Sequence, residues 1–337
     1  MALQSNLGAA SFLFLYYKRM KKLFIYSTLL GCFIIFLFSC QGNKNNENLS
    51  SGQPKDDTVS EAKFPFPYIP DMLREPADRK QYLLQHYWDA FDFTDTLVLA
   101  RKDITEQGFA NQLALLMESS TPDSLLIQSI DNLCRGMERE DYARKLFMQM
   151  AEDYLYQSDS PYYNDRIYAV FLRRMLESAF LDSDSKTSLR FYLDLIQRNN
   201  PGDKATAFTY FLPNGKKGNL NQTEVRGDYL LLVFYDPECS SCHTVLKEMI
   251  SDNRLQQDVL SGHLTVLAVY TEGNEAAWHS ALSDMPQNWI LCQDKMQIRD
   301  QALYDIKAMP SLYLLDSDKK VLLKDASYRK VREYLGY

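Results

Sequence analysis

The apolar positions of this 337-residue chain follow two different periods. Between residues 64 and 201 they recur every three to four positions, which is the spacing of one face of an α-helix. From residue 202 to residue 337, short apolar runs alternate with turn-forming residues and helical stretches, which is typical of an α/β sheet. The change falls at Asn199-Asn200-Pro201-Gly202, a sequence that ends a helix. The pattern therefore predicts a multidomain protein, with an all-α N-terminal domain followed by an α/β domain.

Two signals predict where helices of the first domain begin. Thr121-Pro122 and Ser160-Pro161 each place a capping residue before a proline of the first turn. Each signal leads into an apolar stripe, and a third stripe lies between them. The stripes are Leu126, Ile130, Leu133 and Met137; Tyr142, Leu146, Phe147, Met150 and Tyr154; and Ile167, Val170, Phe171 and Met175. A bundle of about five or six helices accounts for this pattern.

Four apolar runs predict the strands of the second domain. The continuous runs at residues 229–235 and 264–270 are typical of strands buried on both faces of a sheet. Residues 311–316 and 320–325 predict a hairpin. Met309-Pro310 stands at the entrance of the first hairpin strand. Because proline cannot donate a hydrogen bond to a central ladder, this position calls for a special reason.

The first 40 residues have the pattern of an export signal. Lys21 and Lys22 precede an almost uncharged run that ends at Cys40. Residues 37–40, Leu-Phe-Ser-Cys, resemble the lipobox of bacterial lipoproteins, in which the cysteine is diacylated and becomes the first residue of the mature chain. A second such motif ends at Cys32, but cleavage there would leave an apolar segment at the mature N-terminus.

We therefore expect a signal peptide over residues 1–39, with Met20 as its natural start, and a lipidated flexible tether over residues 40–63. An uncleaved membrane anchor is the alternative, because 17 largely apolar residues can just span a bilayer. Either arrangement places the two domains outside the cytoplasm. The lipoprotein would be membrane-anchored in the cell envelope, on the periplasmic face or at the outer membrane.

The charge balance argues against some partners. The chain has 37 Lys and Arg against 44 Asp and Glu, and its net charge is −7. Loss of the four basic residues before Cys40 would bring it to about −11. An acidic surface gives no attraction to nucleic acid or to anionic lipid headgroups. We therefore expect no nucleic-acid partner, and membrane attachment through the N-terminal lipid.

Cys239 and Cys242 follow directly after the first buried strand. Their spacing serves at least three chemistries: a redox-active dithiol, half of a zinc site, or covalent haem attachment, since His243 completes a CxxCH motif. A zinc site would need two further ligands. The remaining candidates, which show no paired spacing, are Cys292, His263 and His279. We therefore expect no metal site, while the motif alone leaves the dithiol and haem attachment open.

Three segments, in order along the second domain, resemble the thioredoxin superfamily. The nearest type is the membrane-tethered thiol-disulfide oxidoreductases that overlap with the alkyl-hydroperoxide-reductase type. The segments are GDKATAFTYFLPNGKKGNL at 202–220, YLLLVFYDPECSSC at 229–242 and MPSLYLLD at 309–316. The resemblance implies a thioredoxin-like fold for residues 202–337, with Pro310 as a cis-proline that faces the cysteines and the Met309 backbone pairing with substrate. It implies no cofactor beyond the Cys239/Cys242 disulfide.

Within this fold, the two cysteines should take different roles. Cys239 would lie where the strand meets the helix, and the unpaired amides and helix dipole there favour a thiolate, so we expect it to attack first. Cys242, one turn further and nearer the interior, would resolve the mixed disulfide. Glu238, which replaces an aromatic residue of the family, and Asp236 should raise the pKa of Cys239 relative to a typical member. His243 could stabilise the thiolate.

The first domain shows less chemistry. Residues 68–93, YIPDMLREPADRKQYLLQHYWDAFDF, resemble a helical domain of unknown function that precedes thioredoxin-like domains in lipoproteins of Gram-negative bacteria. The domain over residues 64–201 has no nucleophile paired with a base and no set of residues with metal-ligand spacing. We expect His86 and Trp88 to pack into the fold and Cys134 to be a small buried apolar residue.

The sequence thus indicates a cell-envelope thiol-disulfide oxidoreductase that exchanges disulfides with exported proteins and takes electrons from an upstream donor. Ser240-Ser241 lacks the proline or histidine that tunes family members, which favours the reductase or isomerase direction. The alternative is a binding module whose fold serves docking and whose Cys239–Cys242 disulfide is structural. We expect the helical domain to supply partner choice or homodimerisation. Cys292 is expected to be a buried strand residue, with a second resolving thiol as the alternative.

Overall fold

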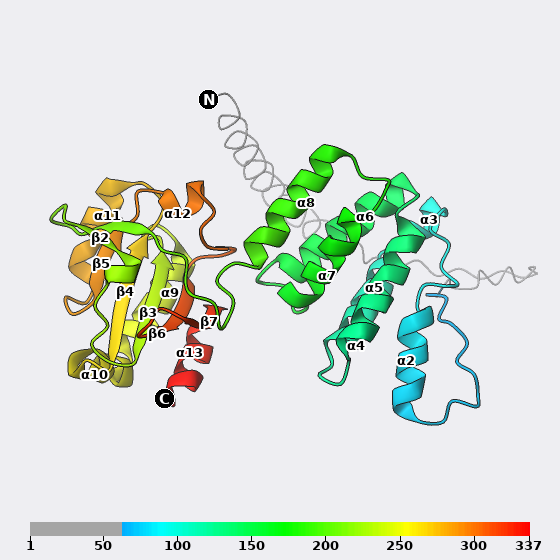
Figure 1. Cartoon of the computed structure of the whole chain (residues 1–337), viewed down its shortest axis with the longest axis horizontal. Helices are drawn as coiled ribbons and strands as arrows, with labels where there is room; N and C mark the ends of the chain where they lie inside the picture. Colours follow the sequence, from blue (N-terminus) through cyan, green and yellow to red (C-terminus); the bar gives the residue numbers. More distant parts are fainter. Residues whose placement is uncertain (1–62) are drawn as a thin grey trace, which may run out of the picture. The chain divides into compact units, whose positions relative to one another are not determined.

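The computed structural model describes residues 63–337 (Figure 1). The expected signal peptide over residues 1–39, the lipidation of Cys40 and nearly all of the tether lie outside the described residues and stay predictions. Over the described part of the chain, no helix is both long and apolar enough to cross a membrane.

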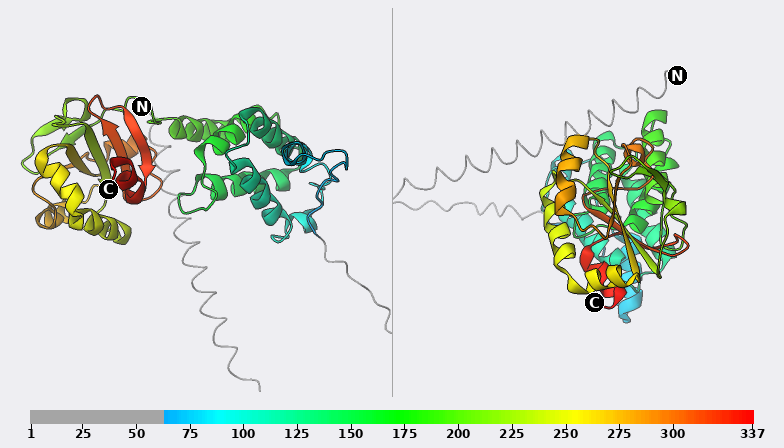
Figure 2. Two further views of the ribbon diagram at one scale, coloured as in Figure 1. Left: turned by 90° about the horizontal axis from the view of Figure 1, so that it is seen from below. Right: turned by 90° about the vertical axis from the view of Figure 1, so that its left-hand side faces the viewer.

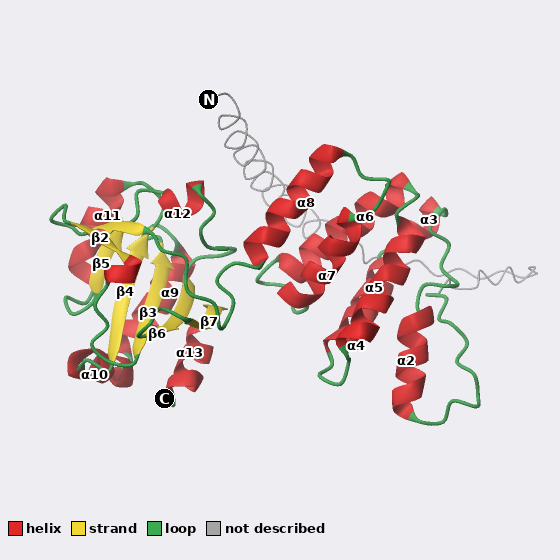
Figure 3. Cartoon of the chain, in the orientation of Figure 1, coloured by secondary structure: helices red, strands yellow, loops and turns green. Residues whose placement is uncertain are grey.

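The first domain is all-α, as predicted (Figure 3). Its α-helices are α2 (Pro76–His86), α3 (Thr96–Leu99), α4 (Thr105–Met117), α5 (Asp123–Met137), α6 (Asp141–Ala151), α7 (Asp165–Leu176) and α8 (Ser183–Ile196), with one π-helical segment, η2 (Glu152–Tyr156). The three predicted stripes supply much of the core, in which Ile130, Phe147 and Met175 are fully buried. An aromatic cluster around Trp88 completes it, with Phe91 and Phe147 edge-on to the Trp88 ring. The fold therefore rests on apolar burial along these helical faces.

The two predicted helix starts are displaced in the structure. Helix α5 begins at Asp123, and the Thr121 hydroxyl donates to the Leu115 carbonyl at 3.0 Å instead of capping α5. Helix α7 begins only at Asp165, because the Ser160 hydroxyl accepts from the Tyr162 amide within a turn. Asn164 is the N-cap of α7, and its side chain accepts from the Ile167 amide. Both hydroxyls bond locally to other backbone groups, which a capping signal in the sequence does not reveal.

The second domain is a seven-stranded mixed sheet in the order β2-β1-β5-β4-β3-β6-β7. The strands are β1 (Thr209–Phe211), β2 (Lys217–Asn219), β3 (Tyr229–Tyr235), β4 (Leu264–Tyr270), β5 (Ile290–Gln293), β6 (Ser311–Asp316) and β7 (Val321–Ala326). Strands β3, β4 and β6 have the predicted bounds, and β7 begins one residue later than predicted. The fold class predicted from the sequence, an all-α domain followed by an α/β domain, is confirmed.

Helices cover both faces of this sheet (Figure 2). They are α9 (Ser240–Ser251), α10 (Asn253–Ser261), α11 (Glu275–Ala281), α12 (Gln297–Asp300) and α13 (Tyr328–Leu335), with one-turn 3-10 helices η3 (Leu220–Gln222) and η4 (Leu282–Asp284). Alternate residues of β3 face opposite cores: Leu231 and Val233 pack with α9, α10 and α13, whereas Leu232 and Phe234 pack on the other side, with α12. Burial on both faces explains why β3 is apolar throughout.

The strand register determines which loops meet at the end of β3. Strand β3 is parallel to β4 and antiparallel to β6, with Phe234 opposite Ser311. The residues just before Ser311 therefore lie beside those that follow Tyr235. The Met309-Pro310 peptide bond is cis, as the resemblance implied.

A largely buried ion cluster joins the two domains. It consists of Asp165, Asp305 and Lys307, together with Lys324, whose ammonium lies 3.8 Å from Asp165. The Lys307 ammonium lies 2.6 Å from an Asp305 oxygen and 3.3 Å from Asp165 at the start of α7. The Tyr156 hydroxyl of the helical domain donates to Asp305 at 2.7 Å. Asp305 and Lys307 belong to the segment that leads into Met309-Pro310. The helical domain is thus bonded to the chain two residues before the cis peptide.

Candidate active site

The two cysteines of the CxxC motif lie at the N-terminus of α9, directly after β3. Cys239 is the N-cap residue with extended backbone angles, and the His243 amide donates to its carbonyl at 3.1 Å. Cys239 is half-buried, whereas Cys242, one turn further, is fully buried against the sheet. Both are thiols in the structure. In this geometry a large reactant can reach the Cys239 sulfur, whereas the Cys242 sulfur is buried.

The cis-proline loop lies against Cys239, as the resemblance implied for Met309 and Pro310. The Met309 carbonyl oxygen is 3.9 Å from the Cys239 sulfur. The Ser241 hydroxyl lies between them, 2.9 Å from the Cys239 sulfur and 2.7 Å from the Met309 carbonyl oxygen. Met309 is 68 positions from Ser241 along the chain, yet Cys239, Ser241 and Met309 form one hydrogen-bonded group.

The surroundings move the two thiol pKa values in opposite directions. Burial acts to raise the pKa of Cys239, but hydrogen bonds from the Ser241 hydroxyl and from Cys242 outweigh it, and the net pKa lies below the usual value of a thiol. For Cys242, burial dominates and raises the pKa to about 12, although the Asp236 amide, 3.4 Å from its sulfur, acts against this. Of the two thiols, Cys239 therefore ionises more readily, and Cys242 stays protonated near neutral pH.

We expect iodoacetamide at about pH 7.5 to modify Cys239 while sparing the other described cysteines, because only thiolates react. Burial raises the pKa of Cys134, Cys242 and Cys292. The rate at Cys239 should rise with pH and level off above a midpoint below 9.0. Peptide mass spectrometry after timed labelling measures this, and equal labelling of Cys239 and Cys242 would contradict it.

The two residues predicted to tune Cys239 point elsewhere. The Glu238 carboxylate accepts from the Asn274 side chain at 3.0 Å, at the N-cap of α11. The ring of His243 contacts the Pro237 carbonyl. The hydrogen bonds that lower the pKa of Cys239 come from Ser241 and Cys242. Ser241 is thus the site residue that sequence reasoning passed over, because a serine inside the motif gives no sign that it reaches the cis-proline loop.

The remaining described cysteines, Cys134 and Cys292, are buried in other elements. Cys292 is buried in β5, where its thiol donates to the Ala268 carbonyl, and Cys134 is buried in α5, so both predictions of burial are confirmed. Trp88 is buried and donates to Gln112, while His86 is paired with Asp89 at the surface. Among the described residues, no group of three or more His, Cys, Asp and Glu is arranged to hold a metal ion.

Comparison with known proteins identifies the family. A thioredoxin-like protein from Bacteroides caccae, known from its crystal structure, is 33% identical to this chain; the alignment covers 82% of this chain and 98% of that one, with a TM-score of 0.71. The chain belongs to the thioredoxin-like family. A family model of a thioredoxin-like domain matches residues 216–334 of this thioredoxin-like protein, and the model of a domain of unknown function, DUF5106, matches residues 39–199.

Two further solved structures are each similar to part of this thioredoxin-like protein. The C-terminal domain of an uncharacterized protein from Bacteroides fragilis is 36% identical, covering 41% of this chain and 99% of that one, with a TM-score of 0.40. The thioredoxin domain of a thiol-disulfide oxidoreductase from Bacteroides vulgatus is 23% identical, covering 40% and 97%, with a TM-score of 0.34. None of the curated proteins matches this chain.

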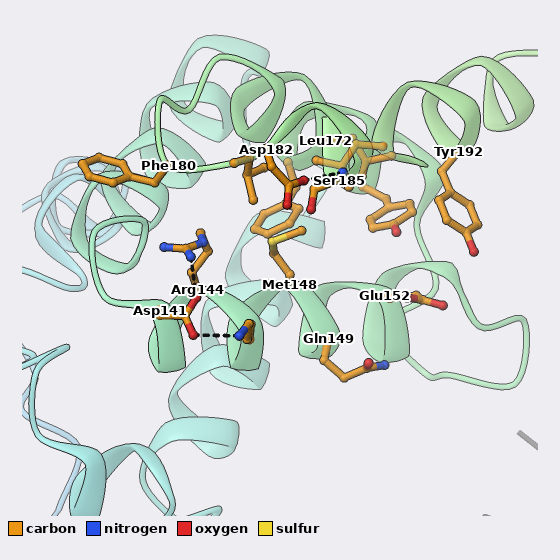
Figure 4. Close-up of a pocket in the computed structure, with 15 residues that line it drawn as sticks. Asp141, Arg144, Met148, Gln149, Glu152, Leu172, Phe180, Asp182, Ser185 and Tyr192 are labelled. Carbon is orange, nitrogen blue, oxygen red and sulfur yellow. Dashed lines mark hydrogen bonds and ion pairs between the residues drawn. The ribbon is translucent and has the colours of Figure 1, made fainter. Parts of the chain in front are cut away.

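The thioredoxin-like protein also has a pocket of about 490 Å³ in its helical domain, lined by residues of α6, η2, α7 and α8 and of the segment between α7 and α8 (Figure 4). Arg144 and Asp141 form an ion pair at one end of the pocket, and Tyr192 lies at the other. All of its lining residues belong to the helical domain, so the pocket is separate from Cys239.

Proposed function

We propose that this protein is a thiol-disulfide oxidoreductase that acts on exported proteins in the cell envelope. The observation that carries the proposal is the pairing of a half-buried Cys239 of lowered pKa with a fully buried Cys242 of raised pKa, next to a cis-proline loop. A low pKa gives the exposed sulfur its nucleophilic form. A high pKa keeps the buried sulfur from competing for the first attack.

The chemistry follows from these positions. The Cys239 thiolate attacks one sulfur of a substrate disulfide, forming a mixed disulfide and releasing the other substrate sulfur as a thiolate, which takes up a proton from water. Cys242 then attacks the Cys239 sulfur, and its proton passes to the departing substrate thiolate. The substrate is reduced by two electrons and Cys239–Cys242 is oxidised. An upstream donor of two electrons and two protons must reduce this disulfide before the next cycle.

Direction and location are further parts of the proposal. The Ser240-Ser241 dipeptide, without proline or histidine, favours the reductase or isomerase direction. Attachment through a lipid on Cys40 would place the site in the cell envelope, where exported proteins carry disulfides. Thiol-disulfide exchange at this site itself uses the Cys239–Cys242 pair without a metal or an organic cofactor.

The test is the redox equilibrium of the purified protein in defined thiol buffers, with Cys239→Ser as the control. We expect reversible exchange at a potential between about −120 and −270 mV, the range of known exchange catalysts. A Cys239–Cys242 disulfide that stays oxidised below about −300 mV would instead indicate a structural bridge and a docking module. A visible spectrum of the same sample reports covalent haem, which would contradict free thiols at this motif.

A further inference from the structure

The Ser241 hydroxyl occupies an unusual position between the nucleophile and the substrate-facing loop. Its oxygen is 2.9 Å from the Cys239 sulfur and 2.7 Å from the Met309 carbonyl oxygen, while the sulfur and that carbonyl oxygen are 3.9 Å apart. Ser240, its neighbour in the motif, is also exposed, but among the hydrogen bonds of the described residues none involves its hydroxyl. The two serines therefore have the same side chain and are both exposed, but they differ in the hydrogen bonds of their hydroxyls.

Proton counting sets the direction of these bonds. A serine hydroxyl has one proton and two acceptor lone pairs. Because a carbonyl oxygen can only accept, the proton of Ser241 is donated to Met309. While Cys239 is a thiol, its S–H faces the Ser241 oxygen at 2.9 Å and, at the longer distance of 3.9 Å, the Met309 carbonyl oxygen. Donation from Cys239 to Ser241 and from Ser241 to Met309 is therefore the arrangement that suits the protonated thiol.

Ionisation of Cys239 reverses one of these bonds. A thiolate has no proton to donate, and its charge makes it a stronger acceptor than a neutral carbonyl. The Ser241 hydroxyl, which rotates freely about its C–O bond, then gains more by donating to the sulfur. The Met309 carbonyl loses its donor at the same moment.

The Met309 carbonyl lies where an extended partner could replace that donor. The register of β6 ends at Ser311 on the β3 side and at Leu312 on the β7 side, so Met309 projects beyond the paired part of the sheet. A backbone carbonyl at such an end can accept from the amide of an added strand.

We propose that Ser241 is a hydroxyl switch: it covers the Met309 carbonyl while Cys239 is a thiol, and it turns to the Cys239 sulfur when the thiolate forms, freeing the carbonyl for an extended segment of the substrate. The inference rests on the proposed disulfide exchange. This switch frees the Met309 carbonyl for the substrate only when Cys239 is a thiolate. Ser241 is a positioning residue in this scheme, because it acts through Cys239 and Met309.

Other titratable groups lie near Cys239, and most of them are bonded elsewhere. Asp236 and Glu238 precede the cysteine, and Glu238 is bonded to Asn274. Glu272, after β4, is paired with Arg299, and burial raises its pKa. Cys242 has a pKa of about 12, and the His243 ring is turned to Pro237. Glu238, Glu272 and His243 are therefore bonded to other groups, and a pH-dependent change at Ser241 is assigned to the sulfur that its hydroxyl contacts.

The test compares Ser241→Ala with the matched control Ser240→Ala. Loss of one hydrogen bond to a charged sulfur should slow alkylation of Cys239 at neutral pH by about tenfold in Ser241→Ala, and leave it unchanged in Ser240→Ala. Ser241→Thr, which keeps the hydroxyl, should restore the rate. Equal alkylation rates in wild type and Ser241→Ala would overturn the switch.

The state of the Met309 carbonyl is measured separately, by ¹³C NMR of protein labelled at its methionine carbonyl carbons. The signal of Met309 is identified by its absence from the spectrum of Met309→Leu. In wild type the Met309 signal should shift with the Cys239 titration. In Ser241→Ala, the chemical shift of the Met309 carbonyl should stay near the value that the wild type has at high pH, whatever the pH. A wild-type signal that stays fixed through the titration would overturn the switch. Neither readout needs turnover, so failure to exchange disulfides would remove the proposed function alone.

Discussion

Replacement of Cys239 by serine should abolish disulfide reduction, whereas replacement of Cys242 by serine should trap the substrate on the protein. A serine hydroxyl does not form a disulfide, so the first change removes the attacking atom, and we expect turnover to fall by about a thousandfold or more. The second change leaves the Cys239 thiolate able to attack but removes the sulfur that resolves the mixed disulfide. Reduction of insulin disulfides measures turnover, and non-reducing gels with mass spectrometry detect the trapped adduct at Cys239.

The buried Cys292 provides the matched control for these variants. It lies in β5 with its thiol bonded to the Ala268 carbonyl, away from the CxxC motif. Cys292→Ala should therefore keep turnover and trap nothing. Trapping in Cys292→Ala, with normal release in Cys242→Ser, would show that Cys292 is the resolving thiol. A Cys239→Ser protein that still reduces insulin would remove Cys239 from the first step.

Local sequence patterns were enough to predict the framework of the site. Strand β3 is a continuous apolar run because both of its faces are buried, and that cause acts within seven residues. The place of Cys239 after this strand can be read from the local sequence, whereas the cis bond before Pro310 was implied by the resemblance to the thioredoxin superfamily. The sequence therefore predicted the cysteines, the loop that faces them and the two domains.

Local sequence patterns could not predict contacts between segments that are distant along the chain. Ser241 bonds to a carbonyl 68 positions away, and nothing in the motif distinguishes it from Ser240. The charged residues Asp165, Asp305 and Lys307 gave no periodic signal, because polar residues usually lie at the surface whatever their contacts. The predicted effect of Glu238 on Cys239 also depended on a side-chain direction, and the structure turns Glu238 to Asn274.

The buried ion cluster gives the helical domain a structural link to the active-site loop. Only 3% of the Lys307 side chain and 1% of the Asp305 side chain are exposed, so water cannot compensate their charges. Burial acts to lower the pKa of Lys307, but Asp305 and Asp165 outweigh it and raise the pKa above its usual value. The ammonium also lies over the rings of Tyr156 and Tyr163 at 4.9 and 5.0 Å. Lys307 is therefore charged, and its partners come from both domains.

Replacement of Lys307 by methionine should destabilise the protein strongly, although the two side chains are similar in length. Without the ammonium, the Asp305 carboxylate is left buried, and within residues 63–337 the Tyr156 hydroxyl is the one side-chain donor that remains to it. Breaking a buried pair in this way costs about 3–5 kcal/mol of unfolding free energy, and about 10 °C of thermal midpoint in a chain of this size. Calorimetry or thermal circular dichroism measures the shift. Lys330→Met, an exposed lysine on α13, should change the midpoint by no more than a degree or two.

A second substitution distinguishes loss of charge balance from loss of packing. In Lys307→Met combined with Asp305→Asn, the buried carboxylate is gone, and the asparagine can still accept from Tyr156. The double variant should therefore recover a large part of the stability that Lys307→Met loses. If the stability losses of Lys307→Met and of Asp305→Asn simply add in the double variant, the cluster is held by packing and not by its charges. If Lys307→Met is as stable as Lys330→Met, the ion cluster does not anchor the loop before Met309, and the helical domain must be held to the α/β domain by its other contacts.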